Sequence, residues 1–468
     1  MNQCYNNNNI NKYTKKLLKL ISCESHDSSI IEKNVKNLSK DVINFFKQKY
    51  EYQNITNESK LTISKIKPLY SQKINKINKN KKLNKNGSCE DLSLIYIICE
   101  KLYNEDIIND IIDSNDLTNV IKFSEWYRMN STKLNLKNIL LDKKGYEIYY
   151  EILYDPCECR KKLHELLYYN QFVSLDVITN AECEDLEYEH YEIDGDDIFI
   201  YNFHGHDKVN IVLVSKIIKY IKVLFKSNKT VELIILFSKQ KKYLYNHKYI
   251  CPDNVNSGMS NGREIFIWRE EDFYKVLIHE LIHHHGIDFY INDDIYEKIN
   301  DIFKLYFEIH EIDNINESYT EALAVLIHSI VYSKENNIDF EKILINEIIF
   351  SHFQIAKILH HFGYKIYEFE NNKNNDKVNV FFQKTSTCSY YIVKCILMMN
   401  YDSLFELWGD DYNFKINDNY IDKYSKILKN DKLDFDMINM YITYFNKIKN
   451  ESPIKFVNKT MRLSLHQC

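Results

Sequence analysis

One segment of the chain carries residue types and spacing that suit hydrolytic chemistry. Within EEDFYKVLIHELIHHHG, the residues His279-Glu280-Leu281-Ile282-His283 form the pattern HExxH. The segment predicts a helix, and positions four apart on a helix share a face, so both imidazoles can reach one Zn²⁺ ion. Glu280 follows the first ligand, where it can hold the water that the metal activates and accept its proton. The motif predicts a metal-dependent hydrolase with Glu280 as general base.

A zinc enzyme also needs a third protein ligand and an open fourth position. The metzincin arrangement, HExxHxxGxxH or D, finds Gly286 at its glycine, but Phe289 stands at the ligand position and Asp288 is one residue out of register. The other candidate is Glu317, which shares one face of a later helix, NESYTEALAVLIHSIVYS, with Glu321. Apolar neighbours predict that this pair is buried, where two acids favour a cation. We expect Glu317 to bind the metal and Glu321 to accept a hydrogen bond from a ligating imidazole.

The two motifs together resemble those of the gluzincins, the thermolysin-like zinc peptidases, whose pattern is HExxH followed by NExx(S/T)(D/E). HELIH and NESYTE carry the resemblance, and a looser similarity of organisation spans residues 190–400. It implies that His279, His283 and Glu317 bind one Zn²⁺ per chain, that Glu280 is the general base, and that Glu321 orients His279. It also implies that the substrate is a protein or peptide.

Peptidases of this type usually present a His or Tyr to the developing oxyanion. The run KTSTCSYYIVKCILMM predicts a helix entered through Ser and Thr, with Tyr390 and Tyr391 near its start. A tyrosine packed in a core is the common alternative at such positions. We favour Tyr390 or Tyr391 from a set of candidates that also contains His310, Tyr319, His352, His360 and His361.

The elements expected around the motifs are strands and helices in alternation. DDIFIYNF, VELIILFS and EIFIWR predict strands, and KVNIVLVSKIIKYIKVLFKSN predicts an amphipathic helix between the first two. The resemblance implies that EIFIWR is the edge strand above the cleft, to which an extended substrate adds. From the residues alone, an ordinary internal strand is an equally good interpretation.

The expected fold class is α+β. We expect a helical N-terminal region with a basic, Asn- and Lys-rich linker over residues 1–87 and a helical domain over 88–185. Residues 186–468 then form a zincin-like metallopeptidase domain, as the resemblance implies. That domain would combine a small mixed sheet with an edge strand, an active-site helix and a helical lower subdomain.

Composition limits the partners and the compartment. The 468 residues carry 61 Lys+Arg and 66 Asp+Glu, so charge favours neither a nucleic-acid partner nor a membrane surface. The sequence shows no signal peptide and no stretch of the roughly 18 apolar residues that a membrane span needs. Eleven scattered cysteines favour an intracellular, reducing compartment, the host cytoplasm or a virion for a viral protein. The excess of Asn, Ile, Lys and Tyr, residues of AT-rich codons, resembles the composition of proteins from a large DNA virus or an AT-rich protist. Together with the two motifs, it resembles that of an uncharacterised metallopeptidase-like protein of giant viruses.

Three functions are compatible with these residues. The leading hypothesis is a zinc-dependent metalloendopeptidase. The alternative is a catalytically inert zincin-fold binding module that engages a host or viral protein. A third hypothesis, a metal hydrolase acting on a non-peptide amide, differs from the first only in its cleft, which the sequence does not reveal. The oligomeric state and the presence of a blocking pro-segment also stay open.

Overall fold

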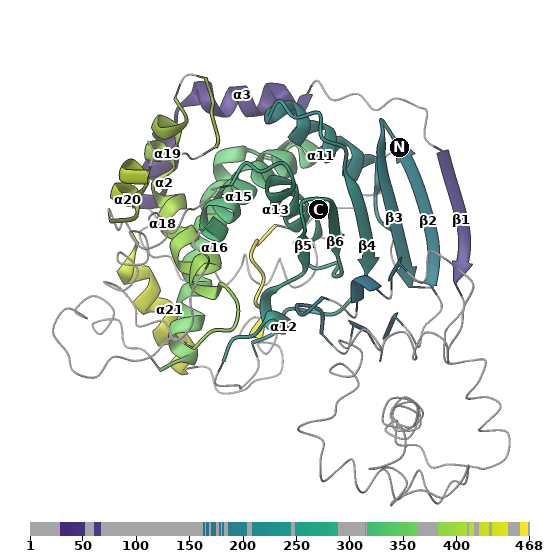
Figure 1. Cartoon of the computed structure of the whole chain (residues 1–468). Coiled ribbons are helices and arrows are strands. Elements are labelled where there is room, and N and C mark those ends of the chain that lie inside the picture. The colour runs from purple at the N-terminus through teal and green to yellow at the C-terminus, as the bar shows by residue number, and fades with distance from the viewer. Residues whose placement is uncertain are drawn as a thin grey trace, which may run out of the picture. The chain divides into compact units, whose positions relative to one another are not determined.

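The structure is a computed structural model that combines one mixed β-sheet with many helices (Figure 1). The α+β class expected from the sequence is therefore confirmed. The described residues are 29–51, 60–66, 162–163, 165–167, 170–174, 177–178, 180–181, 186–203, 208–244, 249–288, 314, 316–363, 382–409, 411–415, 421–429, 433–447 and 459–466. The predicted linker and most of the predicted helical domain lie outside these ranges.

The chain divides into two compact units. One comprises residues 1–61, 190–200 and 208–468, and the other comprises residues 62–189 and 201–207. Every residue of the predicted metal site belongs to the first unit.

Within the described residues, the strands form a single sheet in the order β1-β2-β3-β4-β6-β5. Their bounds are Lys60–Ile66 (β1), Leu186–Ile193 (β2), Asp196–Phe203 (β3), Glu232–Phe237 (β4), Gly258–Ser260 (β5) and Glu264–Ile267 (β6). β6 runs parallel to β4, with Phe266 opposite Ile234, and antiparallel to β5, with Phe266 opposite Met259. The strands expected at DDIFIYNF, VELIILFS and EIFIWR are confirmed as β3, β4 and β6.

The edge-strand position implied for EIFIWR is wrong. β6 lies between β4 and β5, and β5 is the outer strand at this end of the sheet. The physical reason is visible in β6 itself, because Ile265, Phe266 and Ile267 are all buried, as befits a strand covered on both faces and flanked on both edges. The three-residue strand β5 is too short to produce an alternating pattern, so the sequence did not reveal it.

The helices surround one buried helix. Their bounds are Ser29–Lys36 (α2), Lys40–Glu51 (α3), Ile211–Leu224 (α11), Pro252–Val255 (α12), Phe273–His284 (α13), Asn316–Asn336 (α15), Phe340–His361 (α16), Cys388–Val393 (η3, a π-helix), Lys394–Met399 (α18), Tyr401–Trp408 (α19), Ile421–Lys429 (α20) and Phe435–Lys447 (α21). Residues 318–333 of α15 are buried on every side, as expected of a helix that is apolar all round. No helix of the described residues is long and apolar enough to cross a bilayer.

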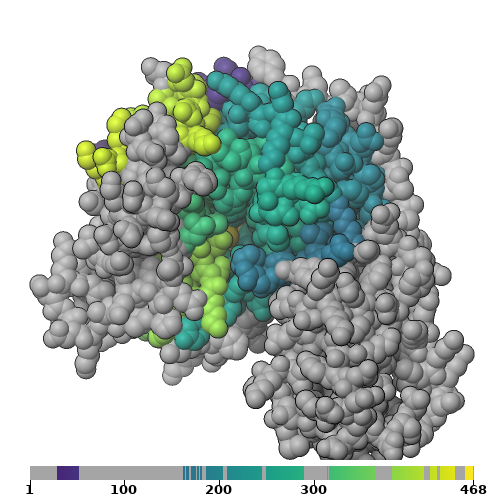
Figure 2. Space-filling view, in the orientation of Figure 1, coloured from purple at the N-terminus to yellow at the C-terminus, as the bar shows by residue number. Residues whose placement is uncertain are grey.

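The elements that carry the predicted site pack directly on one another. α13 contacts α15 on one side and the strands β5 and β6 on another, and Figure 1 shows these elements side by side. Asn210 starts α11 by accepting a hydrogen bond from the Leu213 N–H at 3.2 Å, and α11 in turn packs on α13. In the space-filling view, the teal residues of the sheet region adjoin the green residues of the helical region (Figure 2). The predicted site on α13 and α15 therefore lies beside the strands β5 and β6.

Candidate metal centre

The helix that carries HExxH ends through a glycine cap. Gly286 adopts a φ of +62°, and its N–H donates to the His283 carbonyl oxygen at 2.9 Å. The N–H of Ile287 donates to the Ile282 carbonyl oxygen at 3.2 Å, which completes a Schellman motif. The prediction that Gly286 stops this helix is confirmed. The cap turns the chain sharply, so the residues that follow stay close to the second histidine.

Three side chains from α13 and α15 converge on one point. His279 Nε2 lies 3.0 Å from His283 Nε2 and 3.1 Å from Glu317 Oε2. His283 Nε2 lies 3.3 Å from the same Glu317 oxygen. Among the residues that the structure describes, these three form the group of His, Cys, Asp and Glu side chains whose ligand atoms could hold one metal ion.

The triangle of donor atoms fits a tetrahedral zinc ion. With Zn–N and Zn–O bonds of about 2.0–2.1 Å, tetrahedral geometry separates two ligand atoms by about 3.3 Å. The three observed separations, 3.0 to 3.3 Å, are close to this value. Two imidazole nitrogens and a carboxylate oxygen facing one another repel unless a proton or a cation lies between them. The donor set and its spacing thus suit a divalent ion.

Each imidazole also has a carboxylate at its other nitrogen. His279 Nδ1 lies 2.9 Å from Glu321 Oε2. His283 Nδ1 lies 2.8 Å from Asp288 Oδ2. With both Nδ1 atoms carrying the proton, both Nε2 lone pairs face the centre. Asp288, which the metzincin pattern offered as a ligand out of register, contacts the outer nitrogen of His283 instead.

Glu280 lies beside this triangle in a small pocket. The pocket has a volume of about 30 Å³, enough for a water molecule. Glu280, His279 and Tyr390 line it together with Gly258 at the start of β5. A Cβ atom on Gly258 would stand 2.8 Å from Glu280 Oε1, so only glycine lets the β5 backbone approach the carboxylate this closely. The predicted general base therefore faces the outer strand of the sheet.

The two tyrosines proposed as oxyanion donors have different surroundings. Tyr390 lines the pocket, and its ring centroid lies 6.2 Å from that of His279. Tyr391 is fully buried, and its hydroxyl donates to the Met461 carbonyl oxygen at 2.6 Å. Tyr391 thus has the role in core packing that was the alternative, and the geometry favours Tyr390. The two neighbours differ because adjacent residues of a helix point in different directions.

Burial and mutual attraction shape the pKa values of the cluster. Burial is the largest influence on Glu280 and raises the pKa of its carboxyl group. Burial acts the same way on Glu317, but the neighbouring His283 and His279 outweigh it and hold the pKa of Glu317 well below its ordinary value. Burial lowers the pKa of His279, yet hydrogen bonding to Glu317 and Glu321 raises it overall. The two histidines therefore favour the ionised form of Glu317, whereas burial leaves Glu280 as the more basic carboxylate.

Sequence reasoning missed three residues of the site. Gly258 belongs to a strand too short to recognise, and Asp288 was weighed only as a ligand. Lys275 lies one turn before His279, and its Nζ contacts both carboxylate oxygens of Glu321 at 2.5 and 2.6 Å. The spacing K-x-x-x-H was the available signal for Lys275, since residues four apart share a helix face.

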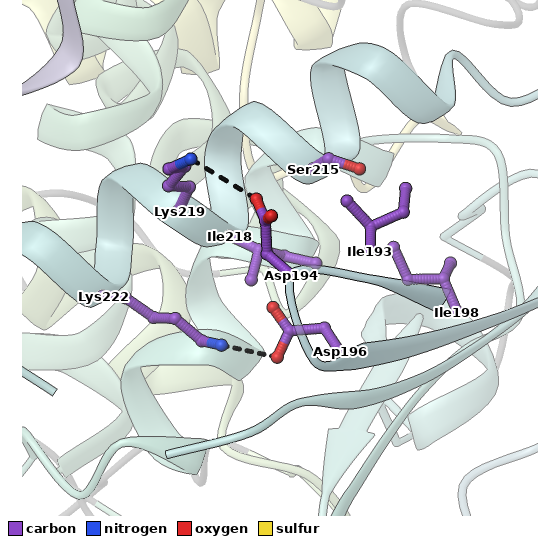
Figure 3. A pocket seen from close by; sticks show the side chains of 8 residues that line it. All are labelled: Ile193, Asp194, Asp196, Ile198, Ser215, Ile218, Lys219 and Lys222. Carbon is purple, nitrogen blue, oxygen red and sulfur yellow. Dashed lines mark hydrogen bonds and ion pairs between the residues drawn. The ribbon is translucent and has the colours of Figure 1, made fainter. Parts of the chain in front are cut away.

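A second cavity, of about 210 Å³, lies between the β2–β3 hairpin and α11 (Figure 3). Lys222 reaches Asp196 at 2.5 Å and Lys219 reaches Asp194 at 3.3 Å across it. Its charged groups therefore pair with each other.

The fold and the cluster define an α+β protein with a His-His-Glu group of metal-ligand spacing. No family profile matches the chain, and no solved structure matches it. It is similar to an uncharacterised protein of Acanthamoeba polyphaga mimivirus, with 26% identity over 216 residues, which cover 44% of this chain and 53% of the relative. The chain thus matches about half the length of that relative. The similarity supports the giant-virus origin that the composition indicates.

Proposed function

We propose that the protein is a zinc-dependent metallopeptidase with a zincin-like catalytic domain. The observation that carries the proposal is the convergence of His279 Nε2, His283 Nε2 and Glu317 Oε2 within 3.3 Å of one another. Two histidines and a carboxylate are a donor set of catalytic zinc sites, which leave a further position for water or substrate. The supporting carboxylates Glu321 and Asp288 are the kind of partner that metal-binding histidines take.

The residues around the centre have the properties that peptide hydrolysis requires. When bound, Zn²⁺ lowers the pKa of water and polarises a carbonyl group. Glu280 accepts the proton of the attacking water and delivers it to the leaving amine, and its raised pKa strengthens it as a base. Tyr390 donates a hydrogen bond to the developing oxyanion. β5, the outer strand, offers its backbone to an extended peptide, which adds to the sheet beside Glu280.

Two variants of the full chain test the proposal. Purified wild-type protein should contain about one zinc per chain, and His283→Ala should lose it because one of three ligands is gone. Glu280→Gln should keep the zinc but hydrolyse an unbiased peptide library at least about a hundredfold more slowly, because the base is removed. Metal content is measured by elemental analysis and cleavage by mass spectrometry.

The same measurements separate the competing hypotheses. Zinc in the wild type without cleavage of any library peptide would favour the inert binding module or a hydrolase for a non-peptide amide. Equal cleavage by the wild type and Glu280→Gln would contradict the role of Glu280. Absence of zinc from wild-type protein purified without chelators and then offered Zn²⁺ would contradict the metal centre itself.

A further inference from the structure

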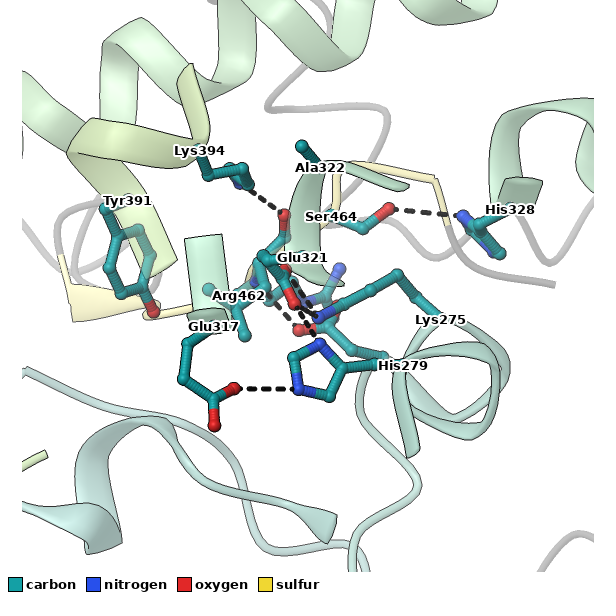
Figure 4. A network of polar contacts seen from close by, with 12 residues as sticks. Lys275, His279, Glu317, Glu321, Ala322, His328, Tyr391, Lys394, Arg462 and Ser464 are labelled. Atoms are coloured by element: carbon teal, nitrogen blue, oxygen red, sulfur yellow. Dashed lines mark hydrogen bonds and ion pairs between the residues drawn. The ribbon is translucent and has the colours of Figure 1, made fainter. Parts of the chain in front are cut away.

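A buried lysine, Lys275, contacts Glu321, which in turn lies beside the predicted metal ligand His279. Lys275 lies on α13 with 1% of its side chain exposed, and its Nζ contacts both oxygens of Glu321 at 2.5 and 2.6 Å (Figure 4). Glu321 is itself fully buried. Lysine is almost never fully buried without a partner, and an unpaired buried charge is strongly destabilising. The buried Lys275 and Glu321 side chains therefore depend on direct contact with each other to stay charged in the interior.

The same carboxylate joins the lysine to a predicted metal ligand. Lys275 precedes His279 by one helical turn, so both side chains leave the same face of α13. Glu321 enters from α15 and faces both of them, because its Oε2 lies 2.9 Å from His279 Nδ1. The chain of contacts runs from Lys275 through Glu321 to His279, whose Nε2 points to His283 and Glu317.

We propose that Lys275 is a positioning residue of the metal centre, which acts through Glu321 to hold His279 in the orientation that binds a metal ion. The inference rests on the proposed metallopeptidase function. Contact with the ammonium group at both oxygens fixes the plane of the Glu321 carboxylate and keeps it an acceptor only. A His279 ring that turns its Nδ1–H to the Glu321 oxygen 2.9 Å away presents its Nε2 lone pair to the metal.

The test measures zinc affinity rather than activity. The dissociation constant for Zn²⁺ is determined on the full chain by competition with a chromogenic chelator, after circular dichroism has shown that each variant is folded. Lys275→Met should bind Zn²⁺ more weakly, by no more than the about ten- to a hundredfold that loss of a direct outer partner of a ligating histidine costs, because Lys275 acts one contact further out. Lys275→Arg should recover most of the affinity, because a guanidinium group also contacts both oxygens of a carboxylate.

A double-mutant cycle with Glu321→Gln tests the route of the effect. If Lys275 acts through Glu321, adding Lys275→Met to Glu321→Gln should not weaken zinc binding further. The absorption spectrum of Co²⁺ bound in place of zinc should differ between Lys275→Met and the wild type, because the His279 ring is reoriented. If Lys275→Met does not fold, Lys275→Gln replaces it, because its shorter, neutral amide removes the charge and cannot span both oxygens of Glu321, so zinc binding should still be weaker than in the wild type.

Lys242→Met is the matched control. Lys242 is a second fully buried lysine that lines the same pocket, but its Nζ pairs with Asp272 at 3.1 Å and not with a carboxylate of the metal site. This variant should keep the zinc affinity of the wild type even where it lowers stability.

The outcomes separate this inference from the function on which it rests. Unchanged zinc affinity in folded Lys275→Met, an equal loss in the presence of Glu321→Gln, or an equal loss in Lys242→Met would each overturn the role of Lys275 while leaving the metal centre intact. A wild-type chain that binds no Zn²⁺ would overturn both.

Discussion

Gly258, in the neighbouring strand β5, determines where the Glu280 carboxylate can lie, because glycine has no side chain. Gly258 begins β5, and an added Cβ would lie 2.7 Å from Val276 Cγ1 and 2.8 Å from Glu280 Oε1. Neither separation is compatible with van der Waals contact, so one of the two side chains would have to move. We expect the Glu280 side chain to move, because a carboxylate at the end of a long side chain is displaced more easily than a valine methyl group near the helix backbone.

We therefore predict that Gly258→Ala impairs hydrolysis without releasing the metal. The new methyl group displaces the Glu280 carboxylate from the pocket, and overpacking of a buried site costs about 1–3 kcal/mol of stability. Peptide cleavage should fall while zinc content stays at the wild-type level. Ser260→Ala, on the same strand, removes an atom instead of adding one and should leave cleavage unchanged. Loss of zinc in Gly258→Ala would contradict the prediction, because the atoms nearest to the added methyl group belong to Val276 and Glu280 and not to a predicted ligand.

At the scale of elements, the end of α13 and the helix α15 together decide which side chains meet. α15 is buried along residues 318–333, so Glu321 faces the interior, while Glu317 just before this stretch is partly exposed. α13 stops at Gly286, and the chain then turns so that Asp288 reaches His283 at 2.8 Å. The glycine cap thus affects the support of one ligand as well as the length of the helix.

This arrangement predicts that Gly286→Ala has two effects. The left-handed backbone, with a φ of +62°, costs a residue with a Cβ about 1–2 kcal/mol, which chemical denaturation will detect. The strained turn should also shift Asp288 and weaken zinc binding. Gly363→Ala is the matched control, since Gly363 ends α16 with a φ of +73° and its N–H donates to the His360 carbonyl oxygen in the same way.

The control variant should lose similar stability yet keep the zinc affinity of the wild type. If both glycine variants bind zinc alike, the turn after α13 does not support the metal centre, and the contribution of Asp288 is limited to local stability.

At the scale of the whole unit, a short segment near the C-terminus connects the elements of the site. Residues 460–466 are buried, and the Leu463 N–H donates to Asp272 Oδ2 at 2.8 Å, directly before α13. The N–H groups of Leu465 and His466 donate to the carboxylate of Glu347 on α16 at 3.0 and 2.9 Å. The carboxylates of Asp272 and Glu347 thus accept hydrogen bonds from backbone N–H groups of this segment, which is buried without being a strand of the sheet.

Two histidines next to this segment predict how stability depends on pH. Burial lowers the pKa of His328 to about 4 and that of His466 to about 3, and the proximity of His328 adds to the effect at His466. In the unfolded chain both have a pKa near 6.5. Below this value the unfolded state binds more protons than the native state, so the free energy of unfolding falls as the pH falls. Each histidine contributes a slope of up to about 1.4 kcal/mol per pH unit.

His466→Leu isolates this contribution from those of other groups. The free energy of unfolding of the variant, measured by denaturant titration with chelator present, should gain on that of the wild type as the pH falls from about 7 to about 4. His360→Leu is the control for replacing a histidine by leucine, because that side chain is exposed on α16. A constant difference for His466→Leu would contradict the prediction, because it would mean that His466 has the same pKa in the native and the unfolded state.

Local patterns predicted much of the architecture near the site. β3, β4, α11, α13 and α15 all appear where periodicity and turn residues indicate them, because each is long enough to show its period. β5 and the internal position of β6 were not predictable in this way. Three residues carry no period, and strand order is a matter of pairing between segments that the local sequence does not encode.

The amino-acid sequence alone determined the chemistry that is available: two histidines one turn apart, an acid between them, and two more acids on a later apolar helix. Helical periodicity suffices for that, because it acts within a few residues. Only the tertiary structure decided which groups meet across the chain. It brought Glu317 to the histidines, Asp288 and Lys275 to their supporting positions, Gly258 against Glu280, and Tyr390 rather than Tyr391 to the pocket. These contacts depend on packing between distant elements, which is cooperative and has no local signature.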